Sequence, residues 1–241
     1  ASFVPQGDNY YFLNRGAVAR HPTDFSLTLL MPFSYNFGEF PGQTNIQGPK
    51  LISFSEYQGE ADIELMCTQL DNKTAKEQSK IVDEWCDHLS NDNLPLKSIW
   101  METRISQKIF NAICKQTGLT SLWIKWGVYP DISAICQLTN LEHLHLGNGK
   151  SITDLSPIAS LHKLKTLESD GLVNVHDYSF LESLTALQDL DIEGDGFSSM
   201  KPVVLPDLKF LETIPWLQRL CMKMVKVEDK DYSPVLKLQN L

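Results

Sequence analysis

Two histidines separated by one residue are the first side chains in the sequence whose spacing suggests chemistry. His143 and His145 flank Leu144, and residues two apart in a β-strand point to the same face. Four carboxylates follow later in the chain at similar alternate spacing: Glu168, Asp170, Asp189 and Asp191. Two imidazoles and a carboxylate are the ligand types of many zinc and iron sites. A metal-binding protein or a metal-dependent enzyme is therefore one hypothesis, if folding brings these acids beside the histidines.

Tryptophan gives a second chemical signal. Trp100, Trp123 and Trp126 are three of the five tryptophans in the chain, and tryptophan is enriched at the energetic centres of protein interfaces. A surface that displays these indoles together is costly to leave in water, which favours a ligand-binding surface. The alternative is that the indoles stack on one another or are covered by the N-terminal segment.

Both signals lie in a segment with a regular leucine period, which must position them. Residues 141–163, LEHLHLGNGKSITDLSPIASLHK, begin with the alternation of a short strand and continue with apolar residues at the spacing of a 3₁₀ turn. The leucines that open each such unit are Leu96, Leu119, Leu141, Leu164, Leu187 and Leu217. The steps between them are 23, 22, 23, 23 and 30 residues, so the units are predicted to stack as coils of a solenoid, with an insertion in the fifth coil.

This pattern resembles the leucine-rich-repeat family, and ITDLSPIASLHKLKTL resembles its bacterial, internalin-like class. The resemblance covers about 60% of the chain and implies a parallel concave sheet backed by 3₁₀ or helical turns. The family has asparagine at the ninth position of each coil, where its amide holds the turn. This chain has other residues there: Arg104, Gly127, Gly149, Leu172, Asp195 and Val225. The turns must therefore be held by other groups.

The concave side of the sheet is the predicted site. If positions one, four and six of each coil face the core, positions three, five and seven line the concave side. Equivalent residues of stacked strands then form columns with a spacing of about 4.8 Å. The predicted partner-binding residues are Trp100, Trp123, Lys125, Trp126, His143, His145, Glu168, Asp170, Asp189, Asp191 and Glu193.

Residues 1–95 show no repeat and are predicted to form an α+β capping region for a solenoid at 96–241, since the first coil needs a polar-faced cover. The expected elements are strands within 9–14, 25–33, 49–57 and 61–70, a loop over 32–49 and one helix at about 74–90. No nucleophile elbow, phosphate loop or metal-ligand motif occurs there. The alternative is that this region holds an activity that the repeats only target.

Composition limits the classes of possible partner and the kinds of cysteine site. A net charge of −9 argues against a nucleic-acid backbone, and no apolar run approaches the roughly 20 residues of a membrane helix. The five cysteines are irregularly spaced without a Cys-x-x-Cys pair, so neither a disulfide framework nor a zinc site follows. Cys114 and Cys136 are predicted to be small core residues. Reduced thiols favour a cytoplasmic location, with export and a cleaved signal as the alternative.

The sequence therefore predicts a non-catalytic interaction module that needs no cofactor or metal and binds a protein or peptide on its concave face. A basic partner segment would complement the acidic middle of that face. A metal-dependent activity at His143 and His145 is the main alternative, although residues on an open concave sheet are widely spaced and wet. The partner's identity and the oligomeric state stay open.

Overall fold

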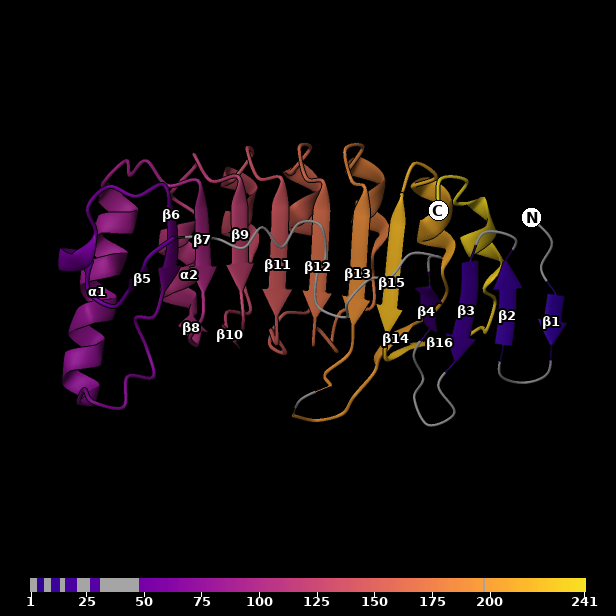
Figure 1. The fold of residues 1–241 in the computed structure, drawn as a ribbon, viewed down its shortest axis with the longest axis horizontal. Coiled ribbons are helices and arrows are strands. Elements are labelled where there is room, and N and C mark those ends of the chain that lie inside the picture. The colour runs from indigo at the N-terminus through magenta and orange to yellow at the C-terminus, as the bar shows by residue number, and fades with distance from the viewer. Residues whose placement is uncertain (1–3, 7–9, 14–15, 21–26, 31–47, 197) are drawn as a thin grey trace.

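The computed structural model describes residues 4–6, 10–13, 16–20, 27–30, 48–196 and 198–241. They form an elongated solenoid, with a sheet along one side and short helical turns along the other (Figure 1). Eight parallel strands build the body of the sheet: β5 (Lys50–Leu51), β6 (Asp62–Leu65), β7 (Ser98–Met101), β9 (Ser121–Ile124), β11 (His143–Gly147), β12 (Thr166–Asp170), β13 (Asp189–Glu193) and β15 (Arg219–Lys223). Each strand pairs in register with the strand of the next coil, as the repeat predicts.

The convex side carries one helical element per coil. These elements are α2 (Gln107–Ile113), η3 (Ser133–Gln137), η4 (Ser156–Ser160), η5 (Ser179–Ser183), η6 (Lys209–Thr213) and η7 (Ser233–Lys237). Two small parallel pairs join neighbouring coils at the turn after the main strands: β8 (Ile105–Ser106) with β10 (Gly127–Val128), and β14 (Val203–Leu205) with β16 (Val225–Val227). The predicted concave sheet with a 3₁₀ and helical convex side is confirmed.

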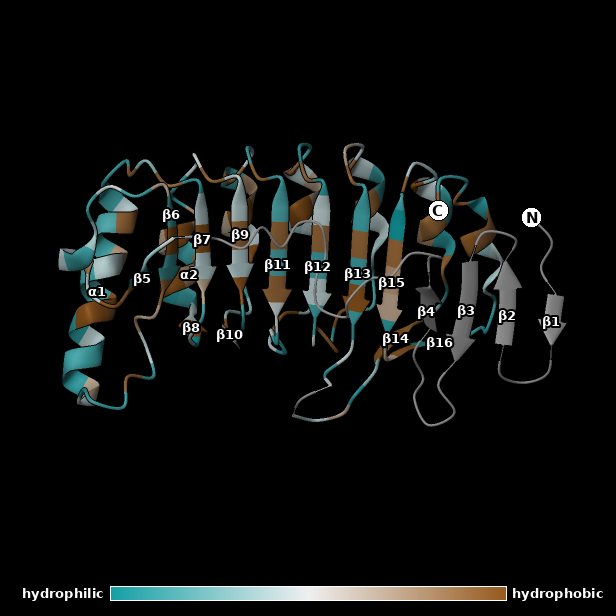
Figure 2. Cartoon of the chain, viewed as in Figure 1, coloured by the Kyte–Doolittle hydropathy of each residue, from teal (hydrophilic) through white to brown (hydrophobic). Residues whose placement is uncertain are grey.

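The leucine period forms the core. The six opening leucines are buried, with exposed fractions of 0–1%: Leu96, Leu119, Leu141, Leu164, Leu187 and Leu217. Positions four and six of the coils are buried as well. Figure 2 shows hydrophobic and hydrophilic residues sharing the strands of the coils, as expected for a sheet with one face in the core. Burying one leucine side chain contributes about 1.5–3 kcal/mol, so repetition of this site is the main stabilising element of the solenoid.

The fourth coil departs from this pattern in a way that the structure explains. Ser169 stands where the other coils have an apolar residue, and it is buried. Its hydroxyl lies 3.2 Å from the hydroxyl of Tyr178 and donates to the carbonyl of Asp191. The serine thus provides a polar partner for a tyrosine that fills the interior. Cys114 is buried as predicted, but the prediction for Cys136 is wrong, because this thiol is exposed on η3.

The sheet continues past both ends of the predicted solenoid. Strands β5 and β6 extend it beyond β7, with Asp62 opposite Ser98. At the other end an antiparallel group joins β15: β4 (Leu27–Leu30), β3 (Gly16–Arg20), β2 (Tyr10–Leu13) and β1 (Val4–Gln6). Strands therefore occur in all four expected segments, although 49–57 is only briefly extended before η2 (Phe54–Glu56). The loop expected at 32–49 lies largely outside the described residues, and the division at residue 95 stays a prediction.

Helix α1 (Ala75–Asn91) covers the first-coil end of the sheet, close to its predicted range. Thr74 and Glu77 form a capping box that satisfies its first N–H groups. One face of the helix is buried, and the indole of Trp85 donates to the carbonyl of Ile52 at 2.8 Å. No helix in the described ranges has the length and apolar character needed to cross a membrane.

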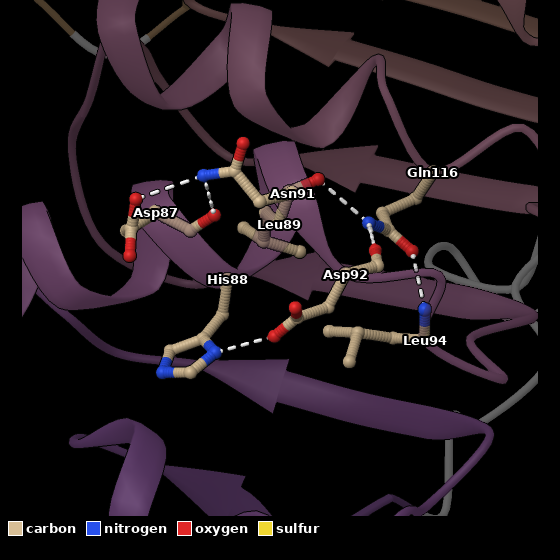
Figure 3. Close-up of polar contacts among 7 residues, drawn as sticks. All are labelled: Asp87, His88, Leu89, Asn91, Asp92, Leu94 and Gln116. Carbon is tan, nitrogen blue, oxygen red and sulfur yellow. Dashed lines mark hydrogen bonds and ion pairs between the residues drawn. The ribbon is translucent and has the colours of Figure 1, made fainter.

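A buried glutamine fastens the end of α1 to the first coil (Figure 3). The side-chain amide of Gln116 donates to the carbonyls of Leu89 and Asp92 at 2.6 and 2.8 Å, and its oxygen accepts from the N–H of Leu94 at 3.2 Å. Nearby, His88 Nδ1 lies 2.5 Å from the carboxylate of Asp92. One carbonyl of the last helical turn and that of the C-cap residue are thus satisfied by a residue of the repeat region.

Candidate binding face

Three columns of side chains line the concave face, and the strand register defines them. The first column is Asp62, Ser98, Ser121, His143, Thr166, Asp189 and Arg219. The central column is Glu64, Trp100, Trp123, His145, Glu168, Asp191 and Cys221. The third column contains Gly147, Asp170, Glu193 and Lys223. Predicted site residues from five coils are thus brought to one surface.

The central column begins with a stack of aromatic rings. The ring centroids of Trp100 and Trp123 are 3.8 Å apart with an interplanar angle of 17°. The imidazole of His145 continues the stack, 4.7 Å from the Trp123 ring and inclined by 15°. The spacing of parallel strands is close to the stacking distance of flat rings, so in-register aromatic residues stack without distorting the sheet. Trp100 and Trp123 are half-buried, and Trp100 Nε1 donates to Glu102 at 3.0 Å.

His145 links this stack to the acids. Its Nδ1 lies 2.9 Å from Oε2 of Glu168 on the next strand. The glycine at position 147 keeps this arrangement possible, because a Cβ there would lie 2.9 Å from His145 Nε2 and 2.3 Å from the carbonyl oxygen of Lys125. The glycine is therefore required by close backbone approach.

From His143 to Arg219, the first column is a chain of hydrogen bonds. The hydroxyl of Thr166 donates to Asp189 at 3.4 Å and can accept from His143 Nδ1, which lies 3.2 Å away. Arg219 completes the chain, with its Nε donating to Asp189 at 2.6 Å beside a second ionic contact. Burial lowers the pKa of His143, so its neutral imidazole is favoured. The two histidines therefore have different partners, although they share a face.

The metal site of the alternative hypothesis is not assembled. Among the residues that the structure describes, no three His, Cys, Asp or Glu side chains form a group that could hold a metal ion. His143 is directed to a threonine and His145 to one carboxylate, so the two imidazoles do not converge. The structure therefore gives no support to the metal-dependent alternative.

The acids of the concave face are more buried than the sequence suggests. The exposed fractions of Glu168, Asp189 and Asp191 are 8%, 5% and 7%. Oδ1 of Asp191 has no hydrogen-bond partner within the described part of the chain, while the carboxylate also contacts the thiol of Cys221. Burial raises the pKa of Asp191 to about 7 and that of Asp170 to about 6. The middle of the face is thus a partly dehydrated acidic region.

Several other predicted charges are already paired within the chain. Lys125 forms an ion pair with Glu102, and Glu193 contacts Lys223 at 3.1 Å. Trp126 lies at the rim, where the guanidinium of Arg104 sits 5.6 Å from the centre of its ring. The role of these residues as partner contacts stays a prediction.

The sequence analysis missed a second, structural ladder on the convex side. An aspartate before each 3₁₀ helix from η3 to η7 accepts a backbone N–H two residues later, at 2.7–2.9 Å: Asp131, Asp154, Asp177, Asp207 and Asp231. These aspartates provide turn contacts that the absent asparagine ladder does not. The repeated Asp at residues 131, 154 and 177, each 23 residues apart, was the available signal.

Asp195, at one of the ninth positions, holds the inserted loop. Its side chain is completely buried and accepts from the N–H groups of Ser198 and Ser199 at 2.9 and 2.7 Å. Lys150, in the turn of an earlier coil, forms an ion pair with the same carboxylate at 2.5 Å. Burial acts to raise the pKa of Asp195, but this ion pair and the serine hydrogen bonds outweigh it and hold that pKa well below the usual range.

Comparison with known proteins supports the architecture. No protein-family model and no curated protein matches the chain. Among solved structures, an internalin (inlF) from Listeria monocytogenes matches 74% of this chain and 45% of its own, with 20% identity and a TM-score of 0.50. Internalin C2 of the same organism matches over 57% and 62%, with 22% identity and a TM-score of 0.43.

A leucine-rich-repeat protein from Leptospira interrogans is also similar, over 74% of this chain and 52% of its own, with 14% identity and a TM-score of 0.36. The chain spans less than two thirds of the length of each of these proteins. At such identities the likeness shows the fold alone. Together with the coil period and the in-register parallel sheet, it shows that the chain has a leucine-rich-repeat solenoid fold similar to that of the internalin inlF.

Proposed function

We propose that the chain is a non-catalytic interaction module that binds a protein partner on its concave face. The observation that carries this proposal is the stack of Trp100, Trp123 and His145 along the central column. The rings are held rigid by one another, so little side-chain entropy is lost when a partner packs against their edges. Half-buried indoles at the centre of a curved surface are typical interaction hot spots.

The charges beside the stack favour a basic partner segment. Asp189 is paired with Arg219 and Glu193 with Lys223, whereas Glu168, Asp170 and Asp191 have no direct ion pair with a Lys or Arg among the described residues. The ammonium of Lys223 is nevertheless near enough to lower the pKa of Asp170 and Asp191, so it offsets part of their charge. The whole chain carries a net charge of −9, which attracts a basic partner at long range. We therefore assign the aromatic rings to affinity and the neighbouring acids to charge selection.

A comparison of two tryptophan variants tests the proposal. Trp123→Ala removes the central ring of the stack, while Trp216→Ala removes a half-buried indole on the turn before β15, outside the three columns. Wild type and both variants, immobilised at equal density, are exposed to the same protein mixture, and the Kd of each retained protein is measured. We expect a partner that Trp123→Ala binds about 30-fold more weakly, equivalent to about 2 kcal/mol, and that Trp216→Ala binds normally. Partners retained equally by all three proteins would place binding elsewhere.

An activity in residues 1–95 is the remaining alternative, and the contacts of α1 argue for a capping role instead. One carbonyl of its last turn is satisfied by Gln116, and its Trp85 is buried against the same core as the coils. We expect a fragment of residues 1–90 to be unfolded or insoluble, because it would expose this apolar face. A stable fragment with cooperative unfolding would support a separate functional domain.

A further inference from the structure

We propose that Glu168, Asp170 and Asp191 form the recognition site for one arginine side chain of the partner. This inference rests on the proposed function, and it names the group that the acidic part of the concave face takes. Glu168 and Asp191 are direct neighbours on β12 and β13, and Asp170 lies two residues along β12 on the same face.

An unsatisfied atom marks the site. Asp191 is 7% exposed, and its Oδ1 has no hydrogen-bond partner among the described residues. A buried carboxylate oxygen without a donor is destabilising, so an incoming N–H donor gains the whole interaction. Asp170 is half-buried and lies nearer to solvent, so it forms the mouth of the site, with Asp191 as its base.

Other carboxylates near Asp191 already have partners within the chain. Asp189 receives two contacts from Arg219, and Glu193 is paired with Lys223. Glu168 gives Oε2 to His145, which is stacked on Trp123 and therefore fixed in orientation. The groups left to a ligand are thus the carboxylates of Asp170 and Asp191 and the second carboxylate oxygen of Glu168, on two neighbouring strands.

The geometry favours a guanidinium over other cations. A metal ion needs converging ligands, and the described residues provide no such group. An ammonium is a compact point charge, whereas a guanidinium presents several N–H donors in one plane and can contact carboxylates on two neighbouring strands at once. Burial raises the pKa of both Asp170 and Asp191 although the nearby ammonium of Lys223 acts to lower it, so a further cation would stabilise both carboxylates.

Three short peptides test the selectivity of the site in the full-length chain. The probes are blocked Gly-Arg-Gly, Gly-Lys-Gly and Gly-citrulline-Gly, where citrulline keeps the shape of arginine without its charge. Binding is followed by NMR shifts of the β12 and β13 amides. We expect a Kd on the order of millimolar for the arginine peptide, several-fold weaker binding of the lysine peptide and none of the citrulline peptide. Equal binding of the citrulline and arginine peptides would overturn the proposal.

Asp191→Asn separates a binding role from a structural one. We expect this variant to bind the arginine peptide at least about tenfold more weakly and to have a higher Tm than wild type, because it removes an unpaired buried charge. The matched control is Glu212→Gln, the same loss of charge at an exposed position of η6 on the convex side, which should change neither value. Unchanged binding of the arginine peptide by Asp191→Asn would overturn the proposal. A lower Tm of this variant would show that the carboxylate stabilises the fold instead.

The two proposals fail in different ways. If a captured partner depends on Trp123 but binds Asp191→Asn as tightly as wild type, the interaction function stands and the arginine site is refuted. If Asp191→Asn weakens the arginine peptide as expected but no partner depends on Trp123, the arginine site stands and the aromatic stack loses its role.

Discussion

Lys150 and Asp195 form an ion pair that joins the turn of the third coil to the insertion of the fifth. The carboxylate is completely buried, while the ammonium group comes from a half-exposed lysine. Serine N–H and hydroxyl groups of the insertion occupy the remaining acceptor positions of Asp195. The inserted loop is therefore organised around one anion.

Replacing Asp195 with alanine should lower the free energy of unfolding by about 2 kcal/mol, because several donors of the loop lose a shared acceptor. Lys150→Met removes the ion pair and a hydrogen bond to the hydroxyl of Ser198 but leaves the serine N–H donors on Asp195, and should cost at most about 1 kcal/mol. Chemical denaturation measures the loss of unfolding free energy in both variants. In limited proteolysis, the Asp195→Ala variant should be cut first within residues 194–208. Because the folded-state pKa of Asp195 is lowered, its stabilisation is present above about pH 4 and is lost as the pH falls further. Equal losses in the two variants would contradict this ranking.

Asp191 should have the opposite pH dependence. Its folded-state pKa of about 7 lies above the ordinary value of about 3.9, so the folded protein holds a proton that the unfolded chain has lost. Wild type therefore loses stability relative to Asp191→Asn as the pH rises from about 4 to 7. Denaturation at several pH values should show Asp191→Asn more stable by about 1–3 kcal/mol at pH 8 and nearly equal to wild type at pH 4–5. A constant difference over this range would refute the assignment.

The coils and their columns were predictable because each follows from spacing within one coil. Leu141, for example, is buried by the residues that its own period places behind it. The state of Glu168 was not predictable in this way, because its burial and its contact with His145 depend on side chains of neighbouring coils. In the sequence Ser169 only interrupts the apolar pattern of its coil, because the contact between its hydroxyl and that of Tyr178 exists only in the folded chain. Spacing identifies which face a residue occupies, whereas its neighbours decide whether it meets water.

Two glycines, one in the first coil and one in the third, provide a matched test of backbone packing. A Cβ on Gly147 would lie 2.3 Å from the carbonyl oxygen of Lys125, whereas the nearest atom to a Cβ on Gly118 is the carbonyl oxygen of Leu96 at 3.5 Å. Gly147→Ala should therefore lower the free energy of unfolding by about 2 kcal/mol or more, while Gly118→Ala should be nearly neutral. Denaturation curves measure the free energy of unfolding of both variants. An unchanged value for Gly147→Ala would contradict the close approach of β9 and β11.

The convex aspartates should contribute additively, because each caps its own turn. Asp154→Ala removes the acceptor for the N–H of Ser156 and should lower the Tm by about 2–4 °C. Asp154→Asn retains an oxygen at the same position and should recover most of this loss. Calorimetry of the single variants at Asp131 and Asp154 and of the double variant checks additivity, which a synergistic loss would disprove.

The in-register stacking of β9, β11 and β12 makes the length of the concave face a separable property of this molecule. Residues 143–165 form one 23-residue period, so excising them as a block would bring β12 against β9 without changing the face that any side chain occupies. Trp123 would then adjoin Glu168, and the imidazole between them would be gone. The distance between two recognition groups on the concave face can thus change in steps of one coil. Ligands of different size can therefore be matched by adding or removing whole coils.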